Sequence, residues 1–184
     1  MTATVVTINK ELEQIVQLSH KNLRANIPEK EQTIQGFITW NYSLQLLQQM
    51  NAQQPHVIVK DNDKVIGYAL VALKESGRFH PDLKAMTDQL ETIQYNNKQL
   101  SAYNYYVMGQ VCIDIAYRGK GVFQMLYGHH KKLFKAAYDF VITEISTSNT
   151  RSLRAHEKVG FKTIYTYEDA IDEWHVVLWD WNYK

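Results

Sequence analysis

The sequence lacks the features of a secreted or membrane-spanning protein. Its one cysteine, Cys112, excludes an internal disulfide bond and fits a reducing compartment. No apolar run approaches the roughly 20 residues that a membrane-spanning helix needs. The first residues, MTATVVTINKELEQ, have neither the basic flank nor the apolar core of a signal peptide. We therefore expect a cytoplasmic protein with no membrane partner.

The chain also lacks an excess of charge of either sign. It contains 20 Lys and Arg residues against 19 Asp and Glu residues, which gives a formal net charge of +1. This balance offers no electrostatic argument for nucleic acid as a partner. It remains compatible with a local basic site that binds one small anion.

Several motifs of nucleotide and metal sites are absent as well. The sequence has no GxxxxGK[ST] motif and no GxGxxG motif, so it predicts neither a P-loop nor a dinucleotide-binding turn. It has no HExxH motif and no cluster of Cys and His. His129 and His130 are neighbours on a predicted helix, where their side chains point about 100° apart. No metal site is therefore predicted.

What is present fits one globular domain over residues 1–184. The hydrophobic fraction of 45% and the charged fraction of 21% are ordinary for a globular protein of this size. Hydrophobic periodicity predicts a mixed α/β fold in a single unit without repeats or linkers. Residues 74–104 are the least regular part, and we expect there either a lid or acceptor-site insertion or a surface excursion that only packs over the sheet. Strands are expected at 4–8, 56–60, 65–73, 105–115, 141–146, 162–167 and 174–181, a loop at 25–31, and helices at 11–23 (capped by Asn9), 39–50, 83–100, 119–137 and 150–159.

The segment VCIDIAYRGKGVFQMLY, residues 111–127, carries the clearest functional signal. A strand ends near Asp114, a glycine-containing turn follows, and an amphipathic helix begins. Glycines let backbone N–H groups approach a ligand closely, and a helix N-terminus adds unpaired donors and a positive dipole end. Arg118 and Lys120 add positive charge. The turn therefore predicts a phosphate or pyrophosphate site.

This segment resembles the pyrophosphate loop of the GCN5-related N-acetyltransferases, the GNAT superfamily, which reads Gln/Arg-x-x-Gly-x-Gly/Ala. Residues 118–121 match, whereas Phe123 stands where a small residue is expected. Its ring either presses against the pyrophosphate or points into the core, and its helical spacing from Tyr127 favours the core. A second resemblance lies in SNTRSLRAHEKVGFKTIYTY, residues 148–167. Asn149, Glu157, Lys158, Gly160 and Phe161 fit the family pattern there, and His156 replaces a common Tyr.

The resemblance implies a mixed, mostly antiparallel sheet with helices on both faces and a splayed central strand pair. It also implies acetyl-coenzyme A (acetyl-CoA) as co-substrate. The main chain of Val111 and Ile113 would bind the pantetheine arm and position the thioester carbonyl. Asn149 would cap a helix and contact the same arm. The pyrophosphate would be cradled by Arg118, Gly119, Lys120, Gly121, Val122 and Phe123.

The catalytic groups are less clear from the sequence. By the resemblance, His156 is the candidate proton donor to the departing thiolate, with Tyr165, Tyr167 and water as alternatives. No residue stands out as the base that deprotonates the acceptor amine. A nucleophilic role for Cys112 is disfavoured, because a cysteine in a predicted buried strand is more often a small core residue. Carboxylates and one histidine near the predicted site, none of them preferred, are Asp114, Glu168, Asp169, Glu173 and His175.

The function implied by the resemblance is direct transfer of an acetyl group to a primary amine. The acceptor is a small-molecule or peptide amine that the sequence does not identify. The alternative is a catalytically silent acyl-CoA-binding module, which the bulky Phe123 and the missing Tyr at position 156 suggest. A homodimer is an expectation from family analogy alone.

Overall fold

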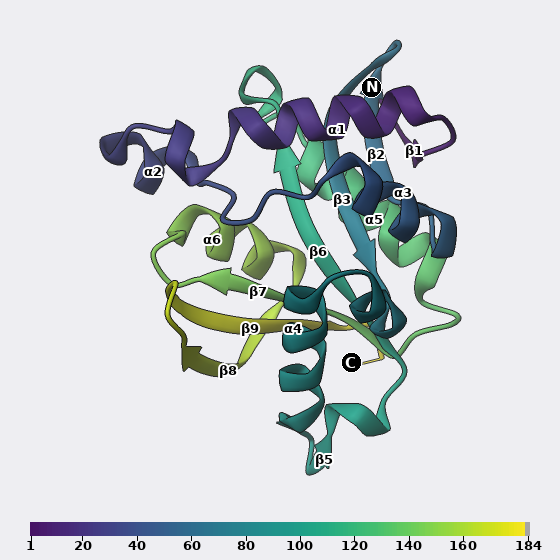
Figure 1. Ribbon diagram of the computed structural model, residues 1–184, viewed down its shortest axis with the longest axis vertical. Helices are drawn as coiled ribbons and strands as arrows, with labels where there is room; N and C mark the ends of the chain where they lie inside the picture. Colours follow the sequence, from purple (N-terminus) through teal and green to yellow (C-terminus); the bar gives the residue numbers. More distant parts are fainter. Residues whose placement is uncertain (183–184) are drawn as a thin grey trace.

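The computed structural model describes residues 1–182 and contains one seven-stranded sheet with helices on both faces (Figure 1). The strand order is β1-β2-β3-β6-β7-β9-β8, and every neighbouring pair is antiparallel except β6 and β7. A two-stranded hairpin, β4 (Gln94–Tyr95) and β5 (Lys98–Gln99), lies outside this sheet. The sheet strands are β1 (Thr2–Val5), β2 (Val57–Asp61), β3 (Lys64–Ala72), β6 (Tyr105–Ile113), β7 (Phe140–Ser146), β8 (Lys162–Glu168) and β9 (Glu173–Asp180).

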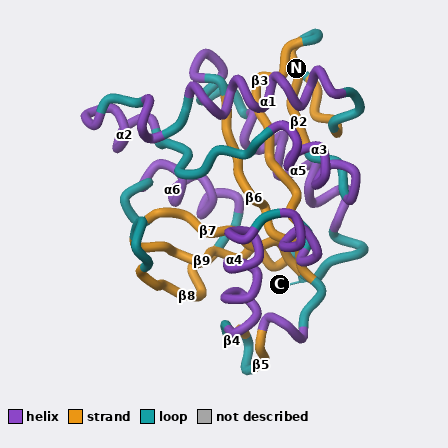
Figure 2. Tube along the Cα trace, in the orientation of Figure 1, coloured by secondary structure: helices purple, strands orange, loops and turns teal. Residues whose placement is uncertain are grey.

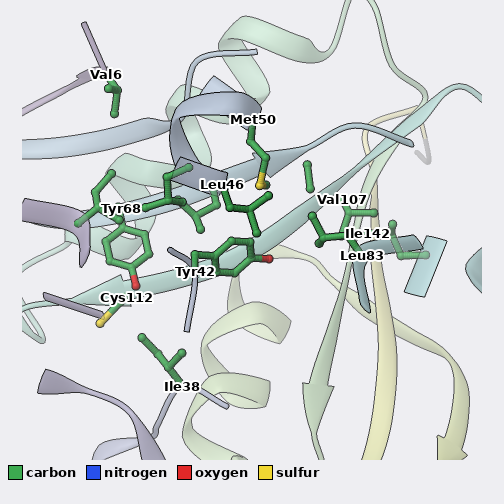
Figure 3. Packing of buried hydrophobic residues seen from close by; sticks show 14 of the residues in the cluster. Val6, Ile38, Tyr42, Leu46, Met50, Tyr68, Leu83, Val107, Cys112 and Ile142 are labelled. Atoms are coloured by element: carbon green, nitrogen blue, oxygen red, sulfur yellow. The ribbon is translucent and has the colours of Figure 1, made fainter. Parts of the chain in front are cut away.

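The helices bury their apolar faces in two clusters, one on each side of the sheet. The first cluster includes Leu46 and Met50 of one helix and Tyr68 of β3 (Figure 3). The second cluster includes Leu126 and Phe134 of another helix. None of the helices within residues 1–182 has the length and apolarity to cross a membrane. The helices are α1 (Asn9–Lys21), α2 (Glu29–Gln35), α3 (Leu44–Gln53), α4 (Pro81–Thr92), α5 (Val122–Phe134) and α6 (Thr150–Val159).

The parallel strands β6 and β7 are splayed, as the resemblance implies. Their register covers only Tyr105–Val107 against 140–142. Beyond this point the Thr143 hydroxyl still donates to the Met108 carbonyl at 2.8 Å, and then the strands diverge (Figure 2). Backbone groups that face such a gap lose their ladder partners and become available to a ligand.

Helix α6 begins and ends at the residues that the sequence predicts, because a capping residue stands at each end. The Asn149 side chain accepts a hydrogen bond from the Ser152 N–H, which makes it the N-cap. Gly160 ends the helix with φ +118°, a conformation that favours glycine. Phe161 is buried behind it.

Other elements differ from the sequence-based expectation. Asn9 is the first residue of α1 rather than its cap, because the Glu11 carboxylate reaches back to accept from the backbone N–H groups of Thr7 and Ile8. The loop expected at 25–31 ends earlier, because residues 29–35 form α2. The helix expected at 39–50 begins only at Leu44, after the Ser43 cap. The helix expected at 83–100 ends at Thr92, before the β4–β5 hairpin.

Candidate functional site

The glycine-containing turn between β6 and α5 leaves open space beside its backbone. Gly119 and Gly121 have φ +76° and +80°, which side chains rarely adopt. A Cβ added at either glycine would meet no atom within 4 Å. The carboxylate of Asp114 accepts from the Ala116 N–H at 3.0 Å and from the Lys64 ammonium at 2.7 Å. Asp114 therefore braces the start of the turn.

The N-terminus of α5 supplies unpaired hydrogen-bond donors at the end of this turn. Gly121 is the N-cap, and no side chain caps the helix. The first N–H groups, those of Val122, Phe123 and Gln124, have no acceptor within the helix. The Phe123 ring packs against Tyr127, with centroids 4.8 Å apart, which agrees with the orientation that its helical spacing favours. The turn thus presents N–H groups and a positive dipole end.

A cavity of about 880 Å³ lies beside the turn. It extends between the end of β6, α6 and residues 34–38. Lys120 does not line it; its ammonium lies 5.3 Å from the centroid of the Tyr117 ring. All other predicted coenzyme-binding residues line the cavity: Val111, Ile113, Arg118, Gly119, Gly121, Val122, Phe123 and Asn149.

Helix α6 adds basic side chains to the same cavity. Arg151, Arg154 and Lys158 are spaced by three and four residues, so they share one face of the helix, and all three line the cavity. Sequence analysis missed them, although their helical spacing was a visible signal. They give the cavity a positive charge suited to an anionic ligand.

The Arg118 side chain is bound by protein groups. Its Nε donates to the Ile113 carbonyl at 3.1 Å, and one Nη donates to the carbonyl and side-chain oxygens of Gln35 at 2.7 and 2.9 Å. The other Nη donates to the Asn22 side-chain oxygen at 2.6 Å. The guanidinium therefore ties the turn to residues that follow α1.

A second cavity of about 90 Å³ occupies the gap between β6 and β7. Residues 108–111 of β6 and 143–146 of β7 line it, with residues 37–40 and Trp174. Val111, Phe37 and Asn149 line both cavities. The Asn149 amide donates to the Phe37 carbonyl at 2.9 Å, so its side chain serves both the α6 cap and the wall between the cavities.

Glu144 of β7 is the titratable carboxyl group in this gap, and sequence analysis did not single it out. Its Oε1 is buried and has no hydrogen-bond partner among the residues that the structure describes. Burial raises the pKa of Glu144 to about 7, helped by the nearby negative charge of Asp169 and opposed by a hydrogen bond with Tyr167. A carboxyl group with this pKa exchanges protons readily at neutral pH.

His156 lines the second cavity, but both of its ring nitrogens have protein partners. Nδ1 lies 2.8 Å from the Ser152 carbonyl, which only accepts, so Nδ1 carries the proton. The Tyr127 hydroxyl therefore donates to Nε2, at 2.6 Å. Burial lowers the pKa of His156 to about 4, so the ring is neutral at pH 7.

The remaining candidates lie elsewhere. Glu168, Asp169, Glu173 and His175 line neither cavity. Burial raises the pKa of the Cys112 thiol to about 12, which keeps it protonated and a poor nucleophile. Within residues 1–182, no group of three His, Cys, Asp or Glu side chains is arranged to hold a metal ion.

Comparison with solved structures shows the same fold in known acetyltransferases. Naa20 from Chaetomium thermophilum, in complex with a bisubstrate analogue, aligns with a TM-score of 0.68 at 14% identity over 98% of this chain and 86% of that chain. The ribosomal-protein-S18-alanine N-acetyltransferase from Escherichia coli aligns with a TM-score of 0.63 at 11% identity, over 100% of this chain and 95% of that chain. A chain of the NatC complex bound to Gag peptide and CoA aligns with a TM-score of 0.63 at 15% identity, over 98% of this chain and 99% of that chain.

The sequence itself was compared with protein families and with curated proteins. None of the curated proteins matches the chain. The Acetyltransferase (GNAT) family matches residues 12–161, which include the turn and α6. The chain belongs to the GNAT acetyltransferase family.

Proposed function

We propose that this protein is an N-acetyltransferase that uses acetyl-CoA and transfers the acetyl group directly to a primary amine. The observation that supports the proposal best is that two cavities adjoin and share lining residues, among them Phe37, Val111 and Asn149. The first begins at the Gly119–Gly121 turn, and the second fills the gap between β6 and β7. In this proposal a long ligand anchored at the turn extends along the first cavity, and its far end lies at the shared lining residues beside the gap.

The coenzyme would be held mainly by main-chain groups. N–H groups of Gly119 and of residues 121–124 would bind the pyrophosphate, and Arg154 and Lys158 would supply further positive charge. The main chain of Val111 and Ile113 would bind the pantetheine arm and hold the thioester carbonyl. Acetyl-CoA supplies the activated acetyl group as a thioester.

Glu144 is proposed as the base that receives the proton from the acceptor ammonium. The carboxylate takes one N–H proton, and the freed amine attacks the thioester carbonyl carbon. As the new C–N bond forms and the C–S bond breaks, the attacking nitrogen must lose a second proton to give the neutral amide, and this loss balances the proton that the departing thiolate takes up. A base with a pKa of about 7 is well matched to this task at neutral pH.

The source of the thiolate's proton remains a prediction. The hydrogen bonds of His156 to Ser152 and Tyr127, and its lowered pKa, leave no ring proton directed at the cavity. These contacts favour water over His156. Tyr167 is also disfavoured, because burial, with the negative charge of Glu144 beside it, raises the pKa of its hydroxyl far above neutral.

The acceptor is proposed to be a small-molecule or peptide amine. The narrow second cavity has an aromatic lining that includes Phe37, Trp40 and Trp174, with Glu144 at one side. Such a site suits an amine on a slender group. NatC was solved with a peptide, which supports a peptide amine among the acceptors to test. A single functional domain over residues 1–184 and a homodimer both remain predictions, and residues 183–184 lie outside the described part.

Incubation of the protein with acetyl-CoA and a panel of peptide and small-molecule amines tests the proposal. The expected result is amine-dependent release of free thiol together with N-acetylated product. Acetyl-CoA binding without thiol release would support the silent module instead, which no observation on the described residues favours. No binding of acetyl-CoA at millimolar concentration would remove both functions.

A further inference from the structure

Residues 22–38, here called the cover loop, form a closed excursion between α1 and α3. The Arg24 N–H donates to the Ile38 carbonyl at 2.9 Å, and the Ile38 N–H donates to the Asn22 carbonyl at 2.9 Å. The loop contains α2, which lies beyond the end of α1 and beside α6 (Figure 1). Gln35, Phe37 and Ile38 line the first cavity, and Phe37 and Ile38 also line the second. The cover loop therefore forms part of the wall of both cavities.

Polar contacts from separate parts of the molecule hold the cover loop. Arg24 pairs with Asp172, next to β9, at 2.8 Å. From α6, Asn149 donates to the Phe37 carbonyl at 2.9 Å and Arg151 donates to the Ile34 carbonyl at 2.9 Å. The turn between β6 and α5, residues 114–121 and here called the coenzyme turn, contributes Arg118, which donates to Gln35 and Asn22.

Arg118 is placed between the C-terminal ends of two helices. Asn22 is the C-cap residue of α1, and Gln35 is the last residue of α2. The Gln35 carbonyl lies at a helix C-terminus, where carbonyl groups lack intrahelical partners and carry partial negative charge, so it binds a guanidinium well. Asn22 accepts through its side-chain oxygen instead. Four hydrogen bonds to Ile113, Gln35 and Asn22 leave little of its donor capacity for a phosphate.

We propose that Arg118 is a positioning residue that couples the coenzyme turn to the acceptor side of the site. Its guanidinium holds the cover loop and leaves the pyrophosphate to the main-chain N–H groups. The inference rests on the proposed function, because it assigns coenzyme binding to the same turn.

The coupling follows from the connectivity. A ligand that fixes the backbone of residues 118–121 also fixes the position of the Arg118 Cα and Cβ atoms, and this limits the positions open to the guanidinium. The guanidinium then confines Gln35 and Asn22, and through them the loop that carries Phe37. Ordering of one site therefore lowers the entropic cost of ordering the other, and the effect is reciprocal.

Hydrogen–deuterium exchange on the full chain, with and without saturating coenzyme A, tests the proposal alongside calorimetry. In the unsubstituted protein, coenzyme A should slow exchange of residues 24–38 by about fivefold or more, the lower end of ordinary coupling. Arg118→Gln should abolish this protection while the Kd for coenzyme A changes by less than about threefold. Arg118→Lys, which keeps the charge but not the planar fork, should restore only part of it.

Matched variants separate the possible outcomes. Arg78→Gln removes an exposed arginine that belongs to neither the cover loop nor the lining of either cavity, and it should leave the protection intact. Should Arg118→Gln fail to fold, Asn22→Ala with Gln35→Ala removes both side-chain acceptors of the guanidinium and should reduce the protection to less than half, since only the Gln35 carbonyl still links Arg118 to the loop. A loss of coenzyme affinity of about tenfold or more in Arg118→Gln, as for a lost charge-assisted bond to phosphate, would overturn the proposal. Retained protection in that variant would overturn it too.

If the unsubstituted protein binds no coenzyme A, the proposed function fails. The exchange of residues 24–38 in the unliganded proteins then decides whether Arg118 holds the loop: faster exchange in Arg118→Gln would support this role, and equal exchange would contradict it.

Discussion

Glu144 is half-buried and His156 is buried beside the gap between β6 and β7, but loss of solvent has opposite consequences for their chemistry. Loss of hydration disfavours the charged form of each group. For Glu144 this raises the pKa to about 7 and makes the carboxyl group an effective proton acceptor near neutral pH. For His156 it lowers the pKa to about 4 and removes the imidazolium from the neutral range.

Substitution of Glu144 tests its role as the base. Glu144→Gln should lower kcat/KM by about 10²- to 10⁴-fold, the usual contribution of a positioned base, with little change in coenzyme binding. The active form is the carboxylate, so the rate of the unsubstituted protein should rise with pH through about 7. That rise should vanish in the variant. Glu173→Gln, an exposed carboxylate on β9, is the control, and equal losses in both variants would contradict the assignment.

His156→Asn tests whether the imidazole acts on the substrate or on the fold. The variant leaves the buried Tyr127 hydroxyl without its acceptor, which should lower the free energy of unfolding by about 1–3 kcal/mol. Turnover per folded molecule should stay within about tenfold, because water supplies the proton in this account. Denaturant titration and initial rates measure the two quantities. Turnover lost with stability unchanged would instead support His156 as the proton donor.

At the scale of elements, short-range signals and tertiary contacts define different parts of the site. The ends of α6 are predictable because Asn149 and Gly160 act through their immediate neighbours. The position of the turn between β6 and α5 is predictable for the same reason. Helix α2 is not, because it is short and its C-terminal carbonyls are held by Arg118 and Arg151 from distant parts of the chain.

The turn before α5 can be tested with a pair of glycines around the same helix. Gly121 has φ +80°, and a Cβ there would project beside the turn, so Gly121→Ala should cost about 1–2 kcal/mol of stability and weaken coenzyme binding. Gly128 lies within α5 with open space around it, so Gly128→Ala should stabilise the protein by up to about 1 kcal/mol. Calorimetry should show weaker coenzyme binding only for Gly121→Ala. The same affinity in both variants would argue against a ligand at the turn.

At the scale of the whole molecule, the sheet brings together residues whose relation the sequence does not reveal. Glu144 lies in an apolar strand, and only the splay of β6 from β7 gives its carboxyl group a cavity to face. The resemblance did predict the splayed pair, and the fold confirms it. Which cavity or side chain the carboxyl group of a strand residue faces depends on the order of the strands, and local propensity does not encode that order.

Buried histidines should make the stability of the whole molecule sensitive to mild acid. Burial lowers the pKa of His56 and His156 to about 4 and that of His130 to about 3. The unfolded chain binds their protons near pH 6.5, so stability is present above that pH and is lost as pH falls toward 4. Glu144, with its raised pKa, titrates in the opposite sense and offsets one of these three protons. In denaturant titrations between pH 7.5 and 4.5, the free energy of unfolding should decrease as the pH is lowered. The slope should correspond to the uptake of up to about two protons on unfolding. A flat or rising profile would contradict this prediction.

The central claim is that main-chain N–H groups of the turn between β6 and α5 bind the diphosphate of the coenzyme. The most direct measurement is a titration of the ¹⁵N-labelled protein with acetyl-CoA, followed by the amide signals of Gly119, Gly121 and Val122. The account predicts that these signals shift most strongly and saturate together below millimolar ligand. Signals that stay in place while the ligand binds elsewhere, or that never respond, would contradict it.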